Sequence, residues 1–175
     1  MKSQVLRMTS PTNTFRSVLD AQTEIPVDLD KLARTLGLSV VRKPMPDDIS
    51  GEITRFGEDS YIIAINSTHP MTRQRFTLAH ELGHYVLHRY LLGNGVTDNK
   101  AYRAVPGGPH SNPNITNGEE TEANRFAASL LMPDPSVQRL KAAGLTPEQM
   151  AEKFQVSIST MRIRLGLKGK SKAAA

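Results

Sequence analysis

The stretch from residue 72 to residue 92 constrains the fold more than any other part of the chain. Apolar and small residues recur in it every three or four positions, and Gly93 ends the pattern, which predicts one long amphipathic helix. This helix also carries His80, Glu81 and His84 as His-Glu-x-x-His. Residues four apart lie on one face of a helix with Cβ atoms about 5–6 Å apart. The fold must therefore accommodate three polar side chains on a helix whose apolar residues are expected to pack in the core.

The spacing of these three residues favours a zinc site. Two imidazoles four residues apart can bind one zinc ion at about 2.0–2.1 Å, and Glu81 can take a proton from a water at the open coordination position. This division of labour is what peptide hydrolysis requires. The alternative is a pair of surface histidines on a core helix. The chain contains no cysteine, which excludes iron–sulfur clusters, disulfide scaffolds and Cys-based zinc fingers.

A catalytic zinc needs a third protein ligand. The metzincin pattern is excluded because Leu87 and Tyr90 stand where it requires Gly and His. His88 is eight residues beyond His80, about 12 Å along the helix, which is too far for both to share one ion with His84. We expect His88 to be a polar residue beside the site.

A second predicted helix, residues 119–132, offers the missing ligand. Glu120 and Asn124 are four apart in it, so Glu120 can bind the metal while Asn124 hydrogen-bonds another ligand from the outer shell. In the competing interpretation, Glu120 forms a capping box with Asn117, and the neighbouring glutamates are solvated helix charges. Spacing alone leaves both interpretations open.

The remaining patterns predict an α+β domain with short ends. We expect a loosely ordered segment at 1–25, a peptidase-sized domain at 26–143, a helical pair at 144–167 and a basic flexible tail at 168–175. Within these boundaries, the patterns predict helices at 26–37 and 134–143, extended runs at 38–44, 49–56 and 61–66, and a long loop at 93–118. The last two extended runs are predicted to form a hairpin through residues 57–60.

Composition limits location and partners. No apolar run has the length of a signal-peptide core or of a membrane span, so we expect a cytoplasmic protein without a membrane partner. The net charge is +5, and part of it lies on Lys168, Lys170 and Lys172. Such an end can bind nucleic acid or an acidic partner, but we interpret it as a solvated tail.

Three stretches resemble the ImmA/IrrE family of zinc metallo-endopeptidases: HELGHYVLH, EANRFAASLLMP and, upstream, IPVDLDKLARTLG. The resemblance runs from Pro26 to Leu167. It implies a zincin-like domain with a small twisted sheet packed on the HExxH helix, followed by C-terminal helices that resemble a helix-turn-helix. It also implies one zinc per chain in a gluzincin-like site, held by His80, His84 and Glu120, which lies thirteen positions before Pro133.

The resemblance further implies a narrow activity. Glu81 would be the general base, and the substrate a co-encoded helix-turn-helix repressor or antitoxin in a phage, mobile-element, toxin–antitoxin or stress-response system. Tyr61, Tyr102 and His110 are candidates for contacting the oxyanion or the substrate, and the sequence does not rank them. The alternative is a non-enzymatic regulator that keeps the fold and binds DNA or a partner protein. The intact motif favours the enzyme, because a pure binder has no need of Glu81.

Two further expectations concern surfaces. The extended run at 61–66 is either a sheet edge that pairs with substrate or an ordinary core strand. The pair at 144–167 resembles a DNA-reading helix-turn-helix and carries Arg162 and Arg164. Against DNA binding, Gln155 replaces the usual turn glycine. We expect the apolar residues of the second helix to make core contacts instead: Ile158, Met161, Ile163 and Leu165.

Overall fold

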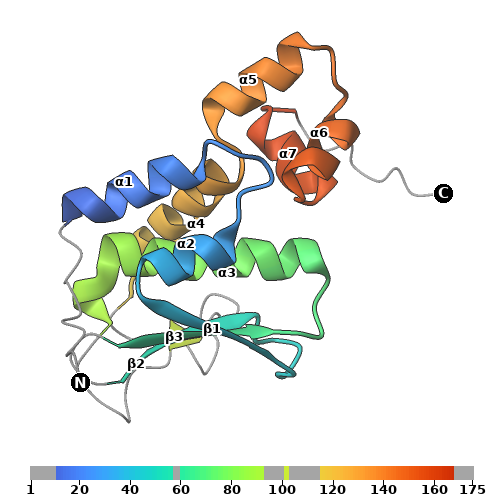
Figure 1. Cartoon of the computed structure of the whole chain (residues 1–175). Coiled ribbons are helices and arrows are strands. Elements are labelled where there is room, and N and C mark those ends of the chain that lie inside the picture. Colours follow the sequence, from blue (N-terminus) through green and yellow to red (C-terminus); the bar gives the residue numbers. More distant parts are fainter. Residues whose placement is uncertain (1–10, 57–59, 93–100, 103–114, 168–175) are drawn as a thin grey trace.

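The computed structural model describes residues 11–56, 60–92, 101–102 and 115–167 (Figure 1). A small sheet forms one layer, and helices cover one of its faces (Figure 1). The predicted α+β class is confirmed. Within the described residues, no helix combines the length and the hydropathy that crossing a membrane would require.

The sheet has four strands in the order β1-β3-β2-β4. They are β1 (Leu38–Lys43), β2 (Gly51–Arg55), β3 (Tyr61–Asn66) and the two-residue β4 (Ala101–Tyr102). β1 runs parallel to β3, whereas β2 runs antiparallel to both β3 and β4. The predicted antiparallel pairing of β2 and β3 is confirmed, while the linking residues 57–59 lie outside the described part of the chain.

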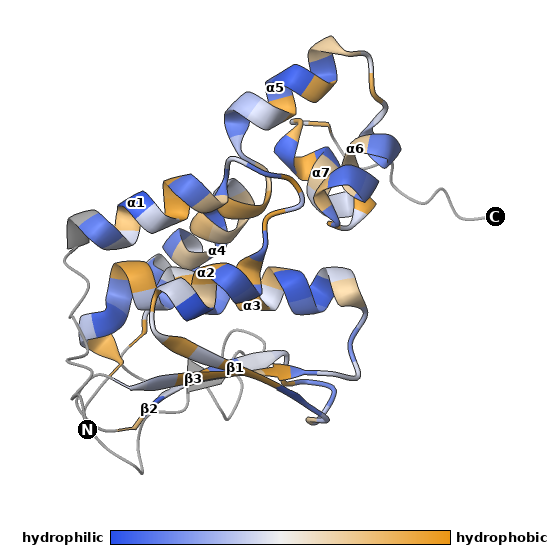
Figure 2. Ribbon diagram, viewed as in Figure 1, coloured by the Kyte–Doolittle hydropathy of each residue, from blue (hydrophilic) through white to orange (hydrophobic). Residues whose placement is uncertain are grey.

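β3 occupies the interior of the sheet between β1 and β2. The edge position considered for residues 61–66 is therefore wrong, and the core-strand interpretation is confirmed. Ile63 and Ile65 are fully buried, as is Ile53 on β2, and Figure 2 shows hydrophobic residues along the strands beneath the helices. A strand buried among neighbours reads as a nearly continuous apolar run, which explains the sequence YIIAIN.

Helix α3 (Met71–His88) packs on β2 and β3 and forms the centre of the molecule. It ends four residues before the predicted limit at residue 92, and a 3-10 turn, η1 (Arg89–Leu91), follows it. β2 approaches α3 closely, because a Cβ on Gly51 would lie 2.6 Å from Thr77 Cγ2. Only glycine fits there without a shift.

Two helices precede the first strand in the sequence. α2 (Leu29–Thr35) was predicted, and Asp28 caps it through a 2.9 Å bond from the Lys31 backbone N–H. Within the segment expected to be loosely ordered, α1 (Pro11–Ala21) is a regular helix, while residues 1–10 lie outside the described part of the chain. Pro at the first helical position is pre-organised for a helix start, and Val18 packs into the core. That burial stabilises a helix whose composition is mostly polar.

The C-terminal half is helical. α4 (Asn117–Leu131) packs along α3, and α5 (Asp134–Ala142), α6 (Pro147–Phe154) and α7 (Ile158–Arg164) follow it. Thr146 and Ser157 cap α6 and α7 through their side chains. Gln155 adopts the left-handed conformation, with φ 53°, in the turn between them. The usual turn geometry is thus kept without glycine, at the cost in strain that a non-glycine residue carries there.

The expectation for the apolar residues of α7 is only partly right. Met161 is fully buried, and Leu165 packs against the core. Ile158 and Ile163, in contrast, are 49% and 79% exposed. A short helix that lies on a core buries one face, so apolar residues on its other face remain in solvent.

Candidate metal centre

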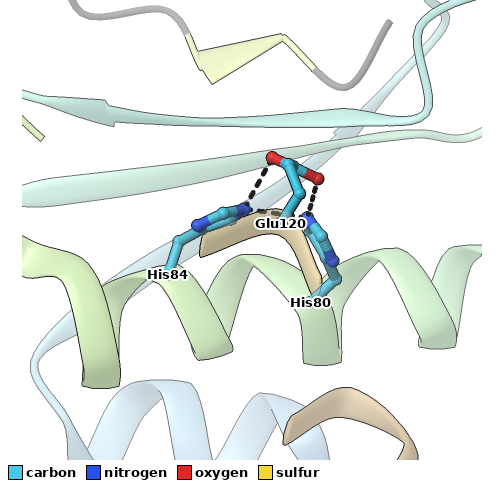
Figure 3. A group of neighbouring side chains, drawn as sticks. All are labelled: His80, His84 and Glu120. Atoms are coloured by element: carbon cyan, nitrogen blue, oxygen red, sulfur yellow. Dashed lines mark hydrogen bonds and ion pairs between the residues drawn. The ribbon is translucent and has the colours of Figure 1, made fainter. Parts of the chain in front are cut away.

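Helices α3 and α4 bring three possible metal ligands together, as Figure 3 shows. The Nε2 atoms of His80 and His84 are 2.9 Å apart. The Glu120 carboxylate spans both rings, with Oε2 3.4 Å from His80 Nε2 and Oε1 3.1 Å from His84 Nε2. Within the described ranges, this is the group of His, Asp and Glu side chains whose ligand atoms converge closely enough to hold a metal ion.

The three residues fit zinc. Ligand atoms at about 2.0–2.1 Å from a tetrahedral zinc lie roughly 3.4 Å apart. Here the two Nε2 atoms are 2.9 Å apart, and they lie 3.1 and 3.4 Å from oxygens of the Glu120 carboxylate. Two nitrogens and one carboxylate oxygen are also the ligand types of catalytic zinc sites, which keep the fourth position for water or substrate. His80 and His84 are buried, while the Glu120 side chain is 39% exposed.

Glu120 is ionised in this setting. Burial raises the pKa of its carboxyl, but hydrogen bonds and charge from His80 and His84 outweigh burial and hold that pKa well below its usual range. A carboxylate is the form that binds a metal ion. The charge state of Glu120 therefore suits the role of a third ligand.

A capping box accounts for a neighbouring glutamate and leaves Glu120 available. Thr116 is the N-cap of α4, and Glu119 at the third helical position accepts a 2.8 Å hydrogen bond from the Thr116 backbone N–H. The two side chains also bond to each other. The box considered between Asn117 and Glu120 is thus wrong by one residue. The pattern Thr-Asn-Gly-Glu was visible in the sequence and could have located it.

Asn124 lies one turn beyond Glu120 and contacts the first histidine. Its Oδ1 is 3.1 Å from His80 Nδ1, so the ring nitrogen facing away from Glu120 has a polar partner. Outer-shell contacts of this kind fix the tautomer and orientation of a metal-binding histidine.

Small residues allow α4 to approach α3 at this point. A Cβ on Gly83 would lie 3.1 Å from Phe126 Cδ1 and 3.2 Å from both the Cα and the carbonyl oxygen of Ala123. Ala123 itself is fully buried. The HELGH glycine thus permits the close packing that carries Glu120 to the histidines.

Glu81 follows His80 directly on α3 and is buried, with 1% of its surface exposed. Its place on the same helix as both histidines follows from the sequence. The surrounding packing removes it from bulk water, a setting in which a carboxylate can act as a base.

His88 is a buried polar residue that reaches α4 rather than the three-residue cluster. Its ring centroid is 5.8 Å from that of His84, and its Nε2 is 3.5 Å from Glu122 Oε2. Burial and His84 lower the pKa of His88, against an opposing effect of Glu122 and Glu119. The expectation of a polar residue beside the site agrees with this position. Glu122, one of the glutamates that the capping-box interpretation left as solvated charges, has a side chain that is 60% exposed and also contacts His88.

Of the other residues considered for substrate contact, Tyr61 lies away from the three ligands. Tyr61 is 4% exposed, and its ring packs edge-on against Tyr85 at 5.1 Å, so we assign it to the core. Tyr102 lies on β4, where its backbone is paired with Glu52. His110 lies outside the described residues.

A family profile and a curated protein sequence both match this chain. The profile of the IrrE N-terminal-like domain, a peptidase family, matches residues 33–166. The chain is 33% identical, over 109 residues, to the radiation response metalloprotease IrrE of Deinococcus radiodurans; the match covers 60% of this chain and 30% of that protein.

A solved structure shares the fold. A Mycobacterium tuberculosis transcriptional regulator superimposes with a TM-score of 0.56 at 17% identity, over 93% of this chain and 48% of the other. The chain thus spans about a third of the curated relative and about half of the solved one. From the family match over most of its length, the chain belongs to the IrrE N-terminal-like domain family.

Proposed function

We propose that this chain is a zinc-dependent endopeptidase that cleaves a peptide bond in a specific regulatory protein. The observation that carries the proposal is the convergence of His80, His84 and Glu120 from two helices, with Glu81 next to the first ligand. The similarity to a radiation response metalloprotease supports both the peptidase chemistry and a stress-response setting. A helix-turn-helix repressor or antitoxin encoded beside the gene is the substrate we propose.

Each residue has a defined task in this proposal. Zinc, when bound, supplies the Lewis acidity that acidifies a water and polarises the peptide carbonyl. Glu81 accepts the proton of the attacking water and delivers it to the leaving amine as the C–N bond breaks. Asn124 holds the His80 ring through the 3.1 Å contact at Nδ1. The low pKa of Glu120 keeps its carboxylate charged as a ligand.

A second function, regulation by binding DNA through α6 and α7, draws support from the structural similarity to the Mycobacterium tuberculosis transcriptional regulator. The arginines that would contact phosphate are engaged elsewhere. Arg162 donates a 2.9 Å hydrogen bond to Glu148, and Arg164 donates to the Met132 carbonyl and to Asp134. These contacts favour a structural role for both arginines, so we rank DNA binding second.

The decisive experiment replaces the base and keeps the ligands. Glu81→Gln preserves shape but removes the proton acceptor, so zinc should remain at about one per chain. Cleavage of the co-encoded repressor should fall roughly 10²–10⁴-fold, the usual contribution of a general base. Zinc content is measured by atomic absorption, and cleavage by mass spectrometry of the products.

Glu148→Gln is the matched control, because it makes the same change at an exposed residue of α6. It should leave both zinc content and cleavage unchanged. Full cleavage by the Glu81→Gln variant would refute the mechanism. A sequence-selective duplex complex of the protein, without cleavage of any co-encoded regulator, would move the second function to first place.

A further inference from the structure

His88 is a buried histidine that the proposed mechanism does not use. It is the last residue of α3 and lies one turn beyond His84. Only 3% of its surface is exposed, although a buried imidazole without good polar partners is costly. Its position therefore calls for an explanation other than solvation.

The polar groups nearest to His88 come from the first two turns of α4. Glu122 Oε2 approaches His88 Nε2 to 3.5 Å, which is a polar contact longer than a direct hydrogen bond. The charge of Glu119 opposes the lowering of the His88 pKa, but neither ring nitrogen of His88 has a hydrogen-bond partner among the described residues. Glu120 lies between these two glutamates in the sequence, so His88 faces the segment that delivers the third ligand.

Three side chains of this segment of α4 contact histidines of α3. Glu120 contacts His80 and His84, Asn124 contacts His80, and Glu122 contacts His88. The contact at His88 lies at the end of α3 that the other two do not reach. It adds to the ligand contacts, the capping box and the packing of Ala123 against Gly83, which also hold this part of α4.

The ring of His88 also lies beside His84. The two ring planes are inclined at 53°. Within the described residues His84 Nδ1 has no hydrogen-bond partner, whereas His80 Nδ1 is held by Asn124. Packing against His88 is thus a contact that can orient the second histidine.

We propose that His88 is a positioning residue of the metal centre, which acts through Glu122 to hold the first turns of α4, and with them Glu120, against the two histidines. This inference rests on the metal centre of the proposed function and adds a residue to it. Outer-shell residues of metal sites typically change affinity about 10–100-fold when removed. A histidine that only filled space would leave metal affinity unchanged when replaced by an apolar residue of similar volume.

The test is a double-mutant cycle read by zinc affinity, measured by competition with a chromophoric chelator. His88→Leu and Glu122→Ala should each weaken zinc binding about 10–100-fold. The double variant should bind no more weakly than the weaker single variant, because the two residues act as one contact. His88→Gln, which retains an N–H donor, should bind zinc nearly as tightly as the original chain.

Two readouts exclude trivial explanations. Loss of the Glu122 charge alone would weaken binding equally in the presence and absence of His88, so only a coupled effect supports the proposal. The absorption spectrum of the cobalt-loaded protein should shift in His88→Leu and stay unchanged in the control Glu148→Ala, which removes an exposed glutamate on α6. If His88→Leu fails to fold, His88→Met, another apolar residue of similar volume, takes its place in the cycle with Glu122→Ala.

Each outcome decides one of the two claims. Unchanged zinc affinity in His88→Leu, or additive losses in the double variant, would overturn the positioning role. Failure of the unaltered chain to bind zinc at all would instead overturn the metal centre. If the chain binds zinc, loses it in Glu120→Ala and keeps its zinc affinity in the His88 and Glu122 variants, only this inference is wrong.

Discussion

Among single residues, Glu120 is the ligand that a second helix must deliver. His80 and His84 share a face of α3 through local geometry, whereas Glu120 reaches them from α4. Its carboxylate stays ionised because the two imidazoles outweigh the effect of burial on its pKa. The metal centre should therefore be most sensitive to this residue.

We expect Glu120→Ala to reduce zinc content well below one per chain. In the unaltered protein, removing zinc with a chelator should lower the melting temperature, since a ligand that binds the folded state stabilises it in proportion to its affinity. The same chelator should have little effect on the variant. Differential scanning fluorimetry with and without chelator makes the measurement, and Glu148→Ala is the control. An equally large chelator effect in Glu120→Ala would contradict the ligand assignment.

Glu148 offers a pH-dependent test at the same scale. Its hydrogen bond from Arg162 lowers the pKa of its carboxyl below the ordinary 4.5. A depressed folded-state pKa contributes stability that is present above the unfolded value and is lost as pH falls through the folded value. Arg162→Gln should move this pKa upward, as measured by carbon-13 NMR of the carboxyl group. No upward movement would show that Arg162 is free for another partner.

Among the secondary-structure elements, the contact of α3 with α4 sets the geometry of the site. A methyl group on Gly83 would come within 3.1–3.2 Å of Phe126 and Ala123, so these neighbours on α4 would have to move by a few tenths of an ångström. A helix interior ordinarily favours alanine over glycine by about 1 kcal/mol. The requirement for glycine here therefore comes from packing against α4, not from the helix itself.

Gly83→Ala should destabilise the protein by about 1–3 kcal/mol, as overpacking of a core does, despite the better helix propensity of alanine. Zinc affinity should also fall, because displacing α4 moves Glu120. Chemical denaturation and chelator competition measure the two effects. Ser129→Ala, at an exposed position of α4, should change neither. An increase in stability from Gly83→Ala would mean that α4 lies farther from α3 than the structure places it.

Arg164 connects the C-terminal helices to the junction of α4 and α5. It donates 3.1 and 3.2 Å hydrogen bonds to the Met132 carbonyl and a 2.6 Å bond to Asp134. Its side chain is 23% exposed. These contacts indicate a structural role for Arg164 and not a contact with a DNA phosphate.

Arg164→Gln should cost about 1.5–3 kcal/mol of unfolding free energy, the range for hydrogen bonds to charged groups. Arg162→Gln, which removes a single solvent-accessible ion pair with Glu148, should cost 1 kcal/mol or less. Urea denaturation distinguishes the two. If both substitutions cost 1 kcal/mol or less and both weaken duplex binding equally, the DNA-binding interpretation of α6 and α7 would be favoured again.

For the whole molecule, one hydrophobic cluster extends from the sheet to the last helix. It contains Ile53 and Ile63 of the strands as well as Phe154 and Met161 of α6 and α7. The C-terminal pair therefore shares its core with the rest of the described chain. Its stability should depend on that shared core.

Met161→Ala should cost about 2–5 kcal/mol, as large-to-small core substitutions do, because Met161 is fully buried. Ile163→Ala, two residues later on the same helix, should change stability by no more than about 0.5 kcal/mol, because most of its side chain already faces solvent. Thermal and urea unfolding compare the pair. Similar costs for both would show that α7 is rotated relative to its place in this structure.

Local rules in the sequence determined much of this protein. Periodicity located the central helix, and the four-residue spacing put His80 and His84 on one face of it. Thr146 and Ser157, residue types that favour helix N-caps, stand directly before the last two helices. These features depend on interactions within one or two helical turns, so they can be predicted from the sequence alone. The family resemblance then selected Glu120 from three neighbouring glutamates.

Only the tertiary structure decided which polar groups meet across elements. It placed Glu120 against the two histidines, with the cap assigned to Glu119, and it brought His88 to Glu122. It also ordered α1 through burial of Val18 and left Ile163 in solvent. The physical reason is common to all of these results: burial and contact depend on how segments distant in sequence pack together, and neither helical spacing nor residue type specifies that packing.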